Sequence, residues 1–401
     1  MRARGPRFKP LGTGARRAIM KTTRPTWAEI SQSKLRHNYR RLRELAGPDT
    51  ELLAVIKANA YGHGLELCAR ALAAEGAGWF GVTSVEEAVA LRAFCPEARI
   101  LAFSGVWPGE GEWVVDHRIT PVVWEPSHFY LLEEAARKRG LGAGELRVHL
   151  EVDTGMSRQG VQVHHLERML SRFRSGSPLR MEALMTHFHT PDEATPTESQ
   201  VRELAKAVEV VARSGLRPEF LSAGSSADVL SQSTRAVSAM AEQHGMRRMV
   251  RTGLALYGYA PQRGAGGGLE PILTWKTRVT SVREIAAGTL VGYGGTFTAA
   301  KTTRLALLPV GYADGFDRSL SNKGWALVRG HRAPVAGRVS MDQVTLDVTE
   351  IPGVAEGDEV VLIGTDRSEH VTAADIAEVT GTIPYEVLTS IAPRVPRELV
   401  A

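Results

Sequence analysis

A lysine at the end of an apolar run is the first side chain in this sequence that could carry covalent chemistry. Lys57 closes a predicted strand, Glu51–Lys57, and precedes a loop that contains Tyr61 and glycines at positions 62 and 64. Burial disfavours the charged form of an amine and lowers its pKa from about 10.4 toward neutrality. The uncharged amine can then act as a base or form a Schiff base. The alternative is a lysine that reaches past the strand to water.

Polar side chains that bind anions or carry protons stand near the ends of other predicted strands. They are Arg158, His187, Ser225 and Arg251. Each alone has an ordinary explanation, such as an ion pair, a hydrogen-bonded core histidine or a helix N-cap. In a barrel, however, the carboxyl ends of all strands meet on one face. With Lys57, these residues predict one site that offers an amine, a cation for a carboxylate, an imidazole and helix starts that bind phosphate.

The elements that must position these residues alternate between short apolar runs and amphipathic stretches of helical period. This β/α rhythm extends from residue 27 to about residue 259 and predicts a (β/α)8 barrel of the TIM type over residues 27–262. A doubly wound parallel sheet is the alternative. The expected strands are Glu51–Lys57, Trp79–Thr83, Arg99–Phe103, Ile119–Val123, Arg147–Asp153, Arg180–His187, Glu219–Ser222 and Met249–Arg251.

The composition changes after residue 262. A glycine-rich stretch, residues 262–269, reads as a linker, and it precedes no helix, so it is not a dinucleotide-binding motif. Residues 270–365 are rich in Val, Thr and Leu in runs broken by Gly, which predicts a mostly β domain over residues 263–401. Its expected strands and one short helix are Trp275–Ile285, Thr303–Pro309, Trp325–Arg329, Glu359–Ile363 and Ala373–Thr380.

The formal net charge of +5 comes from the N-terminus. Residues 1–26 contain eight Lys and Arg and no acidic residue, so the remaining chain is mildly acidic. We predict a disordered basic tail over residues 1–26, with an RNA-binding arm as the alternative, and no nucleic-acid partner for the rest. No apolar run approaches the roughly 20 residues needed to cross a bilayer. The chain has two cysteines, Cys68 and Cys95, which favours a reducing cytoplasm.

Eight motifs in order, from about Trp27 to Arg397, resemble bacterial alanine racemase. An eight-residue motif followed by seven further motifs in the expected order is a far more specific signal than any isolated glycine pattern. The family fold is a barrel that binds pyridoxal phosphate, followed by a β domain, which agrees with the change in composition. The motifs are Lys57–Gly64, Thr154–Arg158, Thr186–Phe188, Arg251 with Gly253, Gly292–Gly294, Gly311–Gly315, Gly337–Gln343 and Pro384–Glu386.

The resemblance implies a cytoplasmic homodimer that interconverts L- and D-alanine with pyridoxal 5'-phosphate. Lys57 would hold the cofactor as a Schiff base and exchange the α-proton on one face. Tyr293 of the partner subunit would serve the opposite face. A free phenol has a pKa of about 10, and His187, between Tyr293 and Arg251 in the family, would supply the polarising contact. Two bases on opposite faces give racemisation, whereas one base would only exchange the proton.

Further roles follow from the same resemblance. Arg251 would face the pyridine nitrogen, where it favours a neutral ring because arginine cannot accept a proton. Arg158 and the backbone amide of the partner subunit's Met341 would hold the substrate carboxylate. The cofactor phosphate would contact Ser225, the amides of Gly253 and Leu254, and the hydroxyls of Tyr61 and Tyr385.

Two residues depart from the family pattern. Glu151 stands where many members carry a carbamylated lysine, and we expect its carboxylate to pair with Arg158 in place of that modification. Gly224 stands where an asparagine is common beside the phosphate-binding serine, which puts one side-chain contact to the cofactor in doubt.

Three rival functions use the same residues differently. The pair His187 and His189, with Asp192 nearby, has the spacing of a metal-dependent amidohydrolase, but Ser225 and Arg251 stand where further ligands would be needed, so we predict no metal. A pyridoxal-phosphate carrier would not need the added β domain. A decarboxylase of the same fold type would need a cysteine in that domain, and both cysteines precede it.

Overall fold

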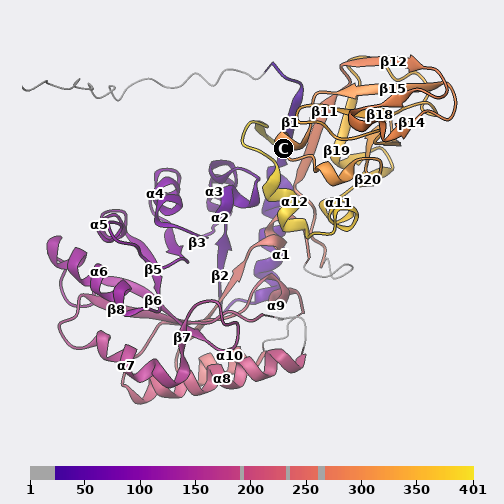
Figure 1. The fold of residues 1–401 in the computed structure, drawn as a ribbon. Coiled ribbons are helices and arrows are strands. Elements are labelled where there is room, and N and C mark those ends of the chain that lie inside the picture. Colours follow the sequence, from indigo (N-terminus) through magenta and orange to yellow (C-terminus); the bar gives the residue numbers. More distant parts are fainter. Residues whose placement is uncertain (1–22, 190–193, 232–234, 261–266) are drawn as a thin grey trace, which may run out of the picture.

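Eight parallel strands close into a barrel in this structure, a computed structural model that describes residues 23–189, 194–231, 235–260 and 267–401 (Figure 1). Pairing of β5 with β6 and of β10 with β2 closes the sheet, and the short strand β7 (Val161–Gln162) adds to β6. The closure confirms the predicted barrel and excludes an open doubly wound sheet. The barrel strands are β2 (Thr50–Val55), β3 (Trp79–Val82), β4 (Arg99–Ala102), β5 (Ile119–Val123), β6 (Leu146–Asp153), β8 (Leu179–Met185), β9 (Phe220–Ser222) and β10 (Arg247–Thr252).

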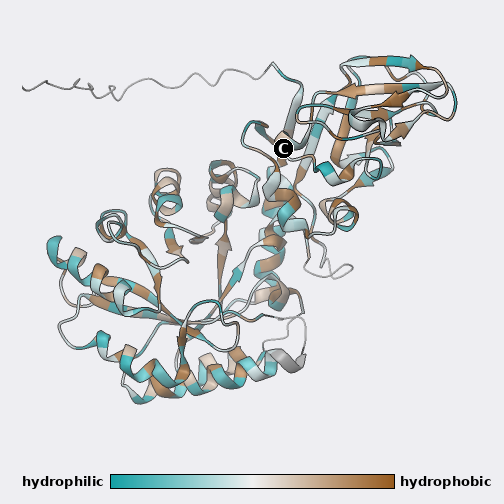
Figure 2. Ribbon diagram, viewed as in Figure 1, coloured by the Kyte–Doolittle hydropathy of each residue, from teal (hydrophilic) through white to brown (hydrophobic). Residues whose placement is uncertain are grey.

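Amphipathic helices surround the barrel. In α1 the side chains of Leu35, Tyr39 and Leu42 recur at helical spacing and are buried, and the Ser31 hydroxyl caps the first turn. Strands β3 and β5 are buried throughout because helices cover the outside of the sheet. Figure 2 shows hydrophilic residues along these helices and largely hydrophobic barrel strands. The helices are α1 (Gln32–Ala46), α3 (Leu65–Ala74), α4 (Val85–Phe94), α5 (Gly111–Asp116), α6 (Pro126–Lys138), α7 (Leu166–Leu170), α8 (Ala194–Arg213), α9 (Ser226–Ser231) and α10 (Arg235–Gln243).

A β-rich region lies beside the barrel and confirms the predicted mostly β C-terminal part (Figure 1). One sheet has the strand order β17-β16-β19-β11-β1-β21, with β20 paired to β19, and smaller sheets are formed by β12-β15-β18 and β13-β14. The elements are β11 (Leu273–Arg278), β12 (Ser281–Ile285), β13 (Leu290–Val291), β14 (Phe297–Thr298), β15 (Thr303–Leu308), β16 (Trp325–Val328), β17 (His331–Pro334), β18 (Val344–Asp347), β19 (Glu359–Asp366), β20 (Glu369–Val371), β21 (Arg397–Val400), α11 (Ala373–Thr380) and α12 (Pro384–Ser390).

Three details of this region differ from the sequence predictions. The predicted run Trp275–Ile285 divides into β11 and β12, which belong to different sheets. Helix α12 was not predicted. Strand β1 (Thr26–Ser31) lies ahead of the barrel in sequence but pairs with β11 and with β21 near the C-terminus. The predicted boundary after residue 262 falls within 261–266, outside the described residues.

The end of the predicted N-terminal tail is part of the fold. Residues 1–22 lie outside the described residues, so disorder there stays a prediction. Arg24 forms an ion pair with Asp314, and the buried Thr26 hydroxyl lies 2.8 Å from that of Thr277. Residues 24–26 therefore belong to the β-rich region rather than to a tail.

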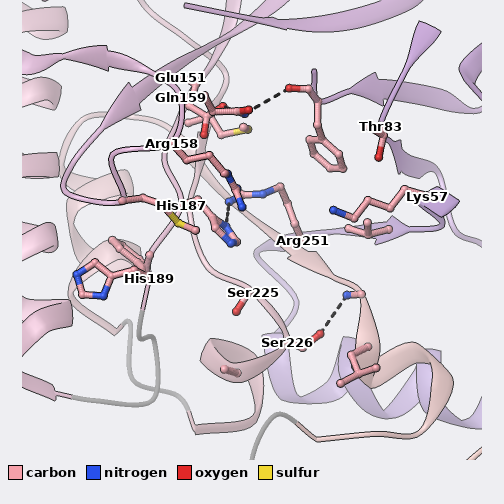
Figure 3. Close-up of a pocket in the computed structure, with 18 of the residues that line it drawn as sticks. Lys57, Thr83, Glu151, Arg158, Gln159, His187, His189, Ser225, Ser226 and Arg251 are labelled. Carbon is pink, nitrogen blue, oxygen red and sulfur yellow. Dashed lines mark hydrogen bonds between the residues drawn. The ribbon is translucent and has the colours of Figure 1, made fainter. Parts of the chain in front are cut away.

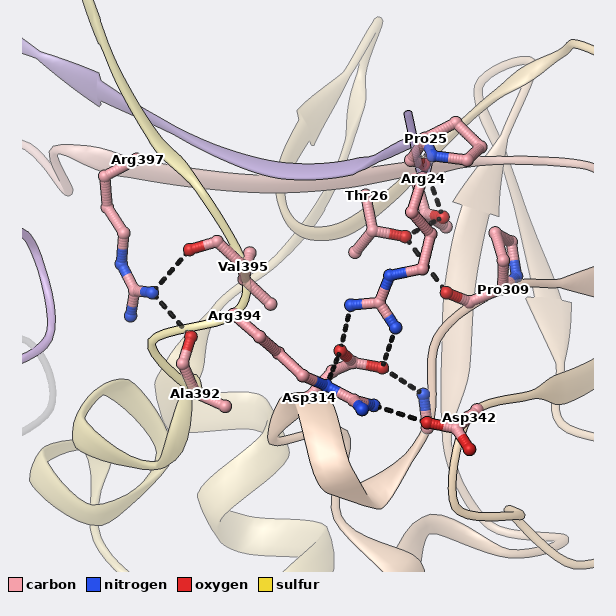
Figure 4. A network of polar contacts seen from close by, with 12 residues as sticks. Arg24, Pro25, Thr26, Pro309, Asp314, Asp342, Ala392, Arg394, Val395 and Arg397 are labelled. Atoms are coloured by element: carbon pink, nitrogen blue, oxygen red, sulfur yellow. Dashed lines mark hydrogen bonds and ion pairs between the residues drawn. The ribbon is translucent and has the colours of Figure 1, made fainter. Parts of the chain in front are cut away.

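A buried carboxylate connects this N-terminal segment to two loops (Figure 4). The side chain of Asp314 has no exposed surface, and it accepts hydrogen bonds from Arg24, from Arg394 Nε at 2.7 Å and from the Gly311 amide at 3.0 Å. Arg394 also donates to Asp342 at 2.7 Å. These bonds to the charged form hold the pKa of Asp314 below its usual value, although burial alone would raise it.

Removal of this carboxylate should destabilise the protein. We expect Asp314→Ala to lower the free energy of unfolding at pH 7 by about 3 kcal/mol, because two guanidinium groups lose a buried partner. A lowered pKa means that the stabilisation is present above pH 4 and is lost as the pH falls through the native-state pKa. Urea unfolding at pH 7 and pH 3 measures both effects. The control, Asp342→Ala, removes a half-exposed carboxylate and should cost about 0.5 kcal/mol; equal losses would contradict this account.

Candidate active site

A cavity of about 600 Å³ opens at the carboxyl ends of the barrel strands (Figure 3). Nine of the eleven predicted site residues line it, whereas Tyr293 and Met341 lie together at a separate hollow of about 530 Å³ in the β-rich region. Both are exposed, Tyr293 to 72%. One chain therefore brings the barrel residues together but not these two. The nine residues in the barrel cavity are Lys57, Tyr61, Arg158, His187, Ser225, Arg251, Gly253, Leu254 and Tyr385.

The backbone after Lys57 turns in the left-handed sense. Residues 58–61 all have φ between +52° and +56°, a conformation that costs residues other than glycine roughly 1–2 kcal/mol each. Side chains compensate, since the Asn59 carboxamide accepts from the Leu65 amide at 2.8 Å and Glu87 accepts from the Ala58 amide at 2.8 Å. Gly62 completes the turn so close to Leu388 that a Cβ would lie 2.3 Å from its carbonyl oxygen. This turn places Lys57 and Tyr61 at one cavity.

The environment of Lys57 favours the neutral amine. Burial is the largest cause of its lowered pKa, and the positive charge of Arg158 adds to the effect, while Glu87 opposes it. Figure 3 shows the amine directed into the cavity toward Arg251. The predicted chemistry of Lys57, an amine able to form a Schiff base, agrees with this setting.

Arg251 is a buried guanidinium fixed by four acceptors. It donates to the Ser222 carbonyl and hydroxyl, both at 2.9 Å, and to the Thr186 carbonyl at 2.7 Å. Its fourth contact is with His187 Nδ1 at 3.2 Å (Figure 3). Burial, followed by the charge of Arg251, lowers the pKa of His187 to about 3. The imidazole is therefore neutral, with Nδ1 as acceptor and the proton on Nε2.

Hydroxyl and amide groups gather at the end of the cavity that Ser225, Ser226 and Gly253 line. The Ser226 hydroxyl accepts from the amides of Gly253, at 3.0 Å, and Ala255, at 3.3 Å, while Ser225 bonds to Asp228. A Cβ on Gly253 would lie 2.4 Å from the Tyr61 hydroxyl, so only glycine allows this approach. Ser226 was not predicted, although its position next to Ser225 was a usable signal.

The expected pairing of Glu151 with Arg158 is wrong. Both line the cavity, but no ion pair joins them within the described part of the chain. The buried Glu151 carboxylate accepts from Gln159 Nε2 at 2.5 Å, and burial raises its pKa. Gly224 has φ of +103°, a conformation that an L side chain rarely adopts.

The amidohydrolase alternative finds no support in the arrangement. Among the described residues no group of three or more His, Cys, Asp or Glu could hold a metal ion. His187 contacts Arg251, and the His189 amide donates to Gln200. Asp192 lies outside the described residues.

Comparison with known proteins assigns the chain to a family. Residues 30–261 match the alanine racemase N-terminal domain and residues 272–399 match the C-terminal domain. The chain belongs to the alanine racemase family. This pyridoxal-phosphate-dependent family consists of isomerases, so the predicted family and enzyme class are confirmed.

Relatives match over nearly the full chain. The alanine racemase of Syntrophobacter fumaroxidans is 39% identical over 370 residues, which are 91% of this chain and 95% of that protein. That of Symbiobacterium thermophilum is also 39% identical, over 93% of this chain and 97% of its own. The crystal structure of the Streptomyces lavendulae alanine racemase has a TM-score of 0.86 at 32% identity and covers 95% of this chain and 98% of its own. No described helix of this alanine racemase family member is long and apolar enough to cross a membrane.

The neutral state of His187 can be measured. We expect its imidazole to stay neutral down to about pH 4 in the PLP-free protein, and Arg251→Gln to raise its pKa while burial still holds it below 6.5. NMR of ¹⁵N-histidine protein, assigned with a His187→Gln variant, follows the titration. Arg247, on the same strand, has an exposed guanidinium. Its replacement, Arg247→Gln, is the control and should leave the pKa of His187 unchanged. A wild-type His187 that titrates near pH 6.5 would contradict this interpretation.

Proposed function

We propose that this chain racemises alanine with pyridoxal 5'-phosphate in the barrel cavity and with two bases that come from two copies of the chain. The observation that carries the proposal is the convergence of the Lys57 amine, the Arg251–His187 pair and Arg158 on one cavity at the barrel mouth. The alanine racemase activity comes from the family; the residue roles below are our proposal.

The cavity suits the cofactor in shape and donor chemistry. A partly desolvated lysine faces hydroxyls and amides across the barrel, and the glycine at 253 keeps the cradle beside Tyr61 open. When bound, pyridoxal phosphate supplies an aldehyde that condenses with an amine and a ring that withdraws electrons from the adjacent carbon. Lys57 would hold it.

The phosphate would lie at the serine end of the cavity. Ser225 and the amides of Gly253 and Leu254 would donate to it, together with the hydroxyls of Tyr61 and Tyr385, once Asp228 releases Ser225 and the Ser226 hydroxyl releases the Gly253 amide. Burial raises the pKa of both tyrosines, so their hydroxyls keep the proton that they would donate. Arg251 would meet the ring nitrogen as a donor.

The two faces of the substrate would be served by different subunits. Lys57 would move the α-proton on one face and Tyr293 of the partner subunit on the other. The exposure of Tyr293 and its separation from its own chain's barrel cavity support a homodimer with shared sites. With its proton on Nε2, His187 could donate to the incoming phenol oxygen and stabilise its deprotonated form.

Arg158 would hold the substrate carboxylate, assisted by the backbone amide of the partner subunit's Met341. Met341 lies at the same hollow as Tyr293, so one docking surface would deliver both groups. Alanine has only a methyl side chain, and a mouth narrowed by Tyr385 and by the partner subunit's Tyr293 would exclude larger amino acids. We also propose a cytoplasmic location, because both cysteines are free and buried.

Shared sites predict complementation between inactive variants. Lys57→Ala and Tyr293→Phe should each abolish racemisation, whereas random pairing of the two variants should restore about one quarter of wild-type activity, since half of the dimers contain one intact site. Loss of optical rotation of L-alanine in D2O, followed together with deuterium incorporation at the α-carbon, measures two-base turnover.

The matched control pairs Lys57→Ala with Arg158→Ala, whose residues share one chain's cavity and should not complement each other. Recovery in this control, or none with Tyr293→Phe, would refute shared sites. Bound cofactor without any turnover in the wild type would instead indicate a carrier.

A further inference from the structure

Glu87 on helix α4 lies outside the set of residues that the proposed function uses. Its two carboxylate oxygens accept from two backbone amides on different strand ends, from Ala58 at 2.8 Å and from Thr83 at 2.7 Å. Ala58 directly follows Lys57 after β2, and Thr83 directly follows β3. One side chain thus joins the peptide next to the reactive lysine to the neighbouring strand.

This arrangement is not the usual use of a glutamate at the third position of a helix. Ser84 is the N-cap of α4, and its hydroxyl accepts from the Glu87 amide at 3.3 Å. In a capping box the glutamate would bond back to the amide of Ser84 itself. Here the carboxylate passes that amide and takes those of Thr83 and Ala58 instead.

The bonded amide stands at the start of the strained turn. Ala58 has φ of +52° and is the first of four consecutive left-handed residues. Its orientation determines the direction in which the Lys57 side chain leaves the backbone. The Glu87 carboxylate, which accepts from this amide, therefore fixes the Lys57–Ala58 peptide next to which the lysine side chain starts.

The charge of Glu87 also matters at this position. Arg158, which lines the cavity, disfavours the protonated amine of Lys57, whereas Glu87 favours it. The other titratable groups that line the cavity are Tyr61, Glu151, His187, His189, Arg251 and Tyr385.

We propose that Glu87 is a positioning residue for Lys57, which holds the Lys57–Ala58 peptide against the end of β3 and sets one negative charge beside the amine. The inference rests on the proposed function only for the choice of Lys57 as the amine of interest, because the contacts of Glu87 themselves involve no cofactor.

The test compares Glu87→Gln with Glu86→Gln in full-length protein freed of PLP. Both substitutions remove one charge from the first turn of α4, so any effect of the helix dipole is shared. Acylation of Lys57, quantified by mass spectrometry across pH, reports the pKa of its amine. We expect the midpoint for Glu87→Gln to fall by about 0.5–1 pH unit relative to wild type, and Glu86→Gln to leave it unchanged.

Cofactor binding supplies the second readout. We expect Glu87→Gln to weaken PLP binding about tenfold, the equivalent of one lost charge-assisted hydrogen bond, and Glu87→Ala to weaken it further. Identical acylation midpoints and PLP affinities for Glu86→Gln and Glu87→Gln would overturn the proposal. If Glu87→Ala does not fold, Glu87→Gln alone decides, because its side chain keeps one acceptor oxygen.

The two readouts separate this inference from the proposed function. The acylation profile needs neither cofactor nor substrate, so a shifted midpoint supports the role of Glu87 even if another residue held PLP. Wild-type protein that binds no PLP while the midpoint still shifts would refute the proposed function and leave this inference standing.

Discussion

A lysine that is to form a Schiff base, the role proposed for Lys57, must be fixed in direction, and in this chain the left-handed turn at residues 58–61 follows it directly. The turn places Lys57 and Tyr61 on the same cavity within five residues. This conformation is unfavourable for residues other than glycine, and none of residues 58–61 is a glycine. Contacts from elsewhere must therefore hold it: Glu87 from α4, and the packing of Gly62 against Leu388 from α12. The geometry of the lysine thus depends on the barrel and the C-terminal segment together.

The charges around the cavity follow from the same desolvation. Arg251 remains buried because four acceptors receive its donors. Burial, together with the charge of this guanidinium, keeps His187 neutral, which leaves the imidazole as a donor through Nε2 rather than as a competing cation. A carboxylate in place of Arg251 would favour the imidazolium and would accept a proton from a pyridine ring. The site is therefore organised around a buried cation that donates hydrogen bonds without transferring protons.

The sequence predicted the barrel and half of its site because both depend on local patterns. Lys57, Arg158, His187, Ser225 and Arg251 stand at or near strand ends, and closure of the barrel brings such ends together whatever the exact strand limits. Tyr385 came only from the resemblance, since helix α12 is short and was not predicted.

Contacts between distant side chains were beyond such patterns. The bond from the Ala58 amide to Glu87 joins residues 29 positions apart, and Gln159, not Arg158, donates to the Glu151 carboxylate. Strand β1 pairs with β11 and β21, which are distant in sequence, and no periodicity reveals these partners.

Contacts between distant residues also support the β-rich region around Asp314. Tyr312 and Ala313 donate to the carbonyls of Ser340 and Met341, at 3.0 Å each, so the turn that Asp314 caps also fixes the loop that carries Met341. In the proposed homodimer this loop would serve the partner subunit's site, since it stands away from the barrel cavity of its own chain.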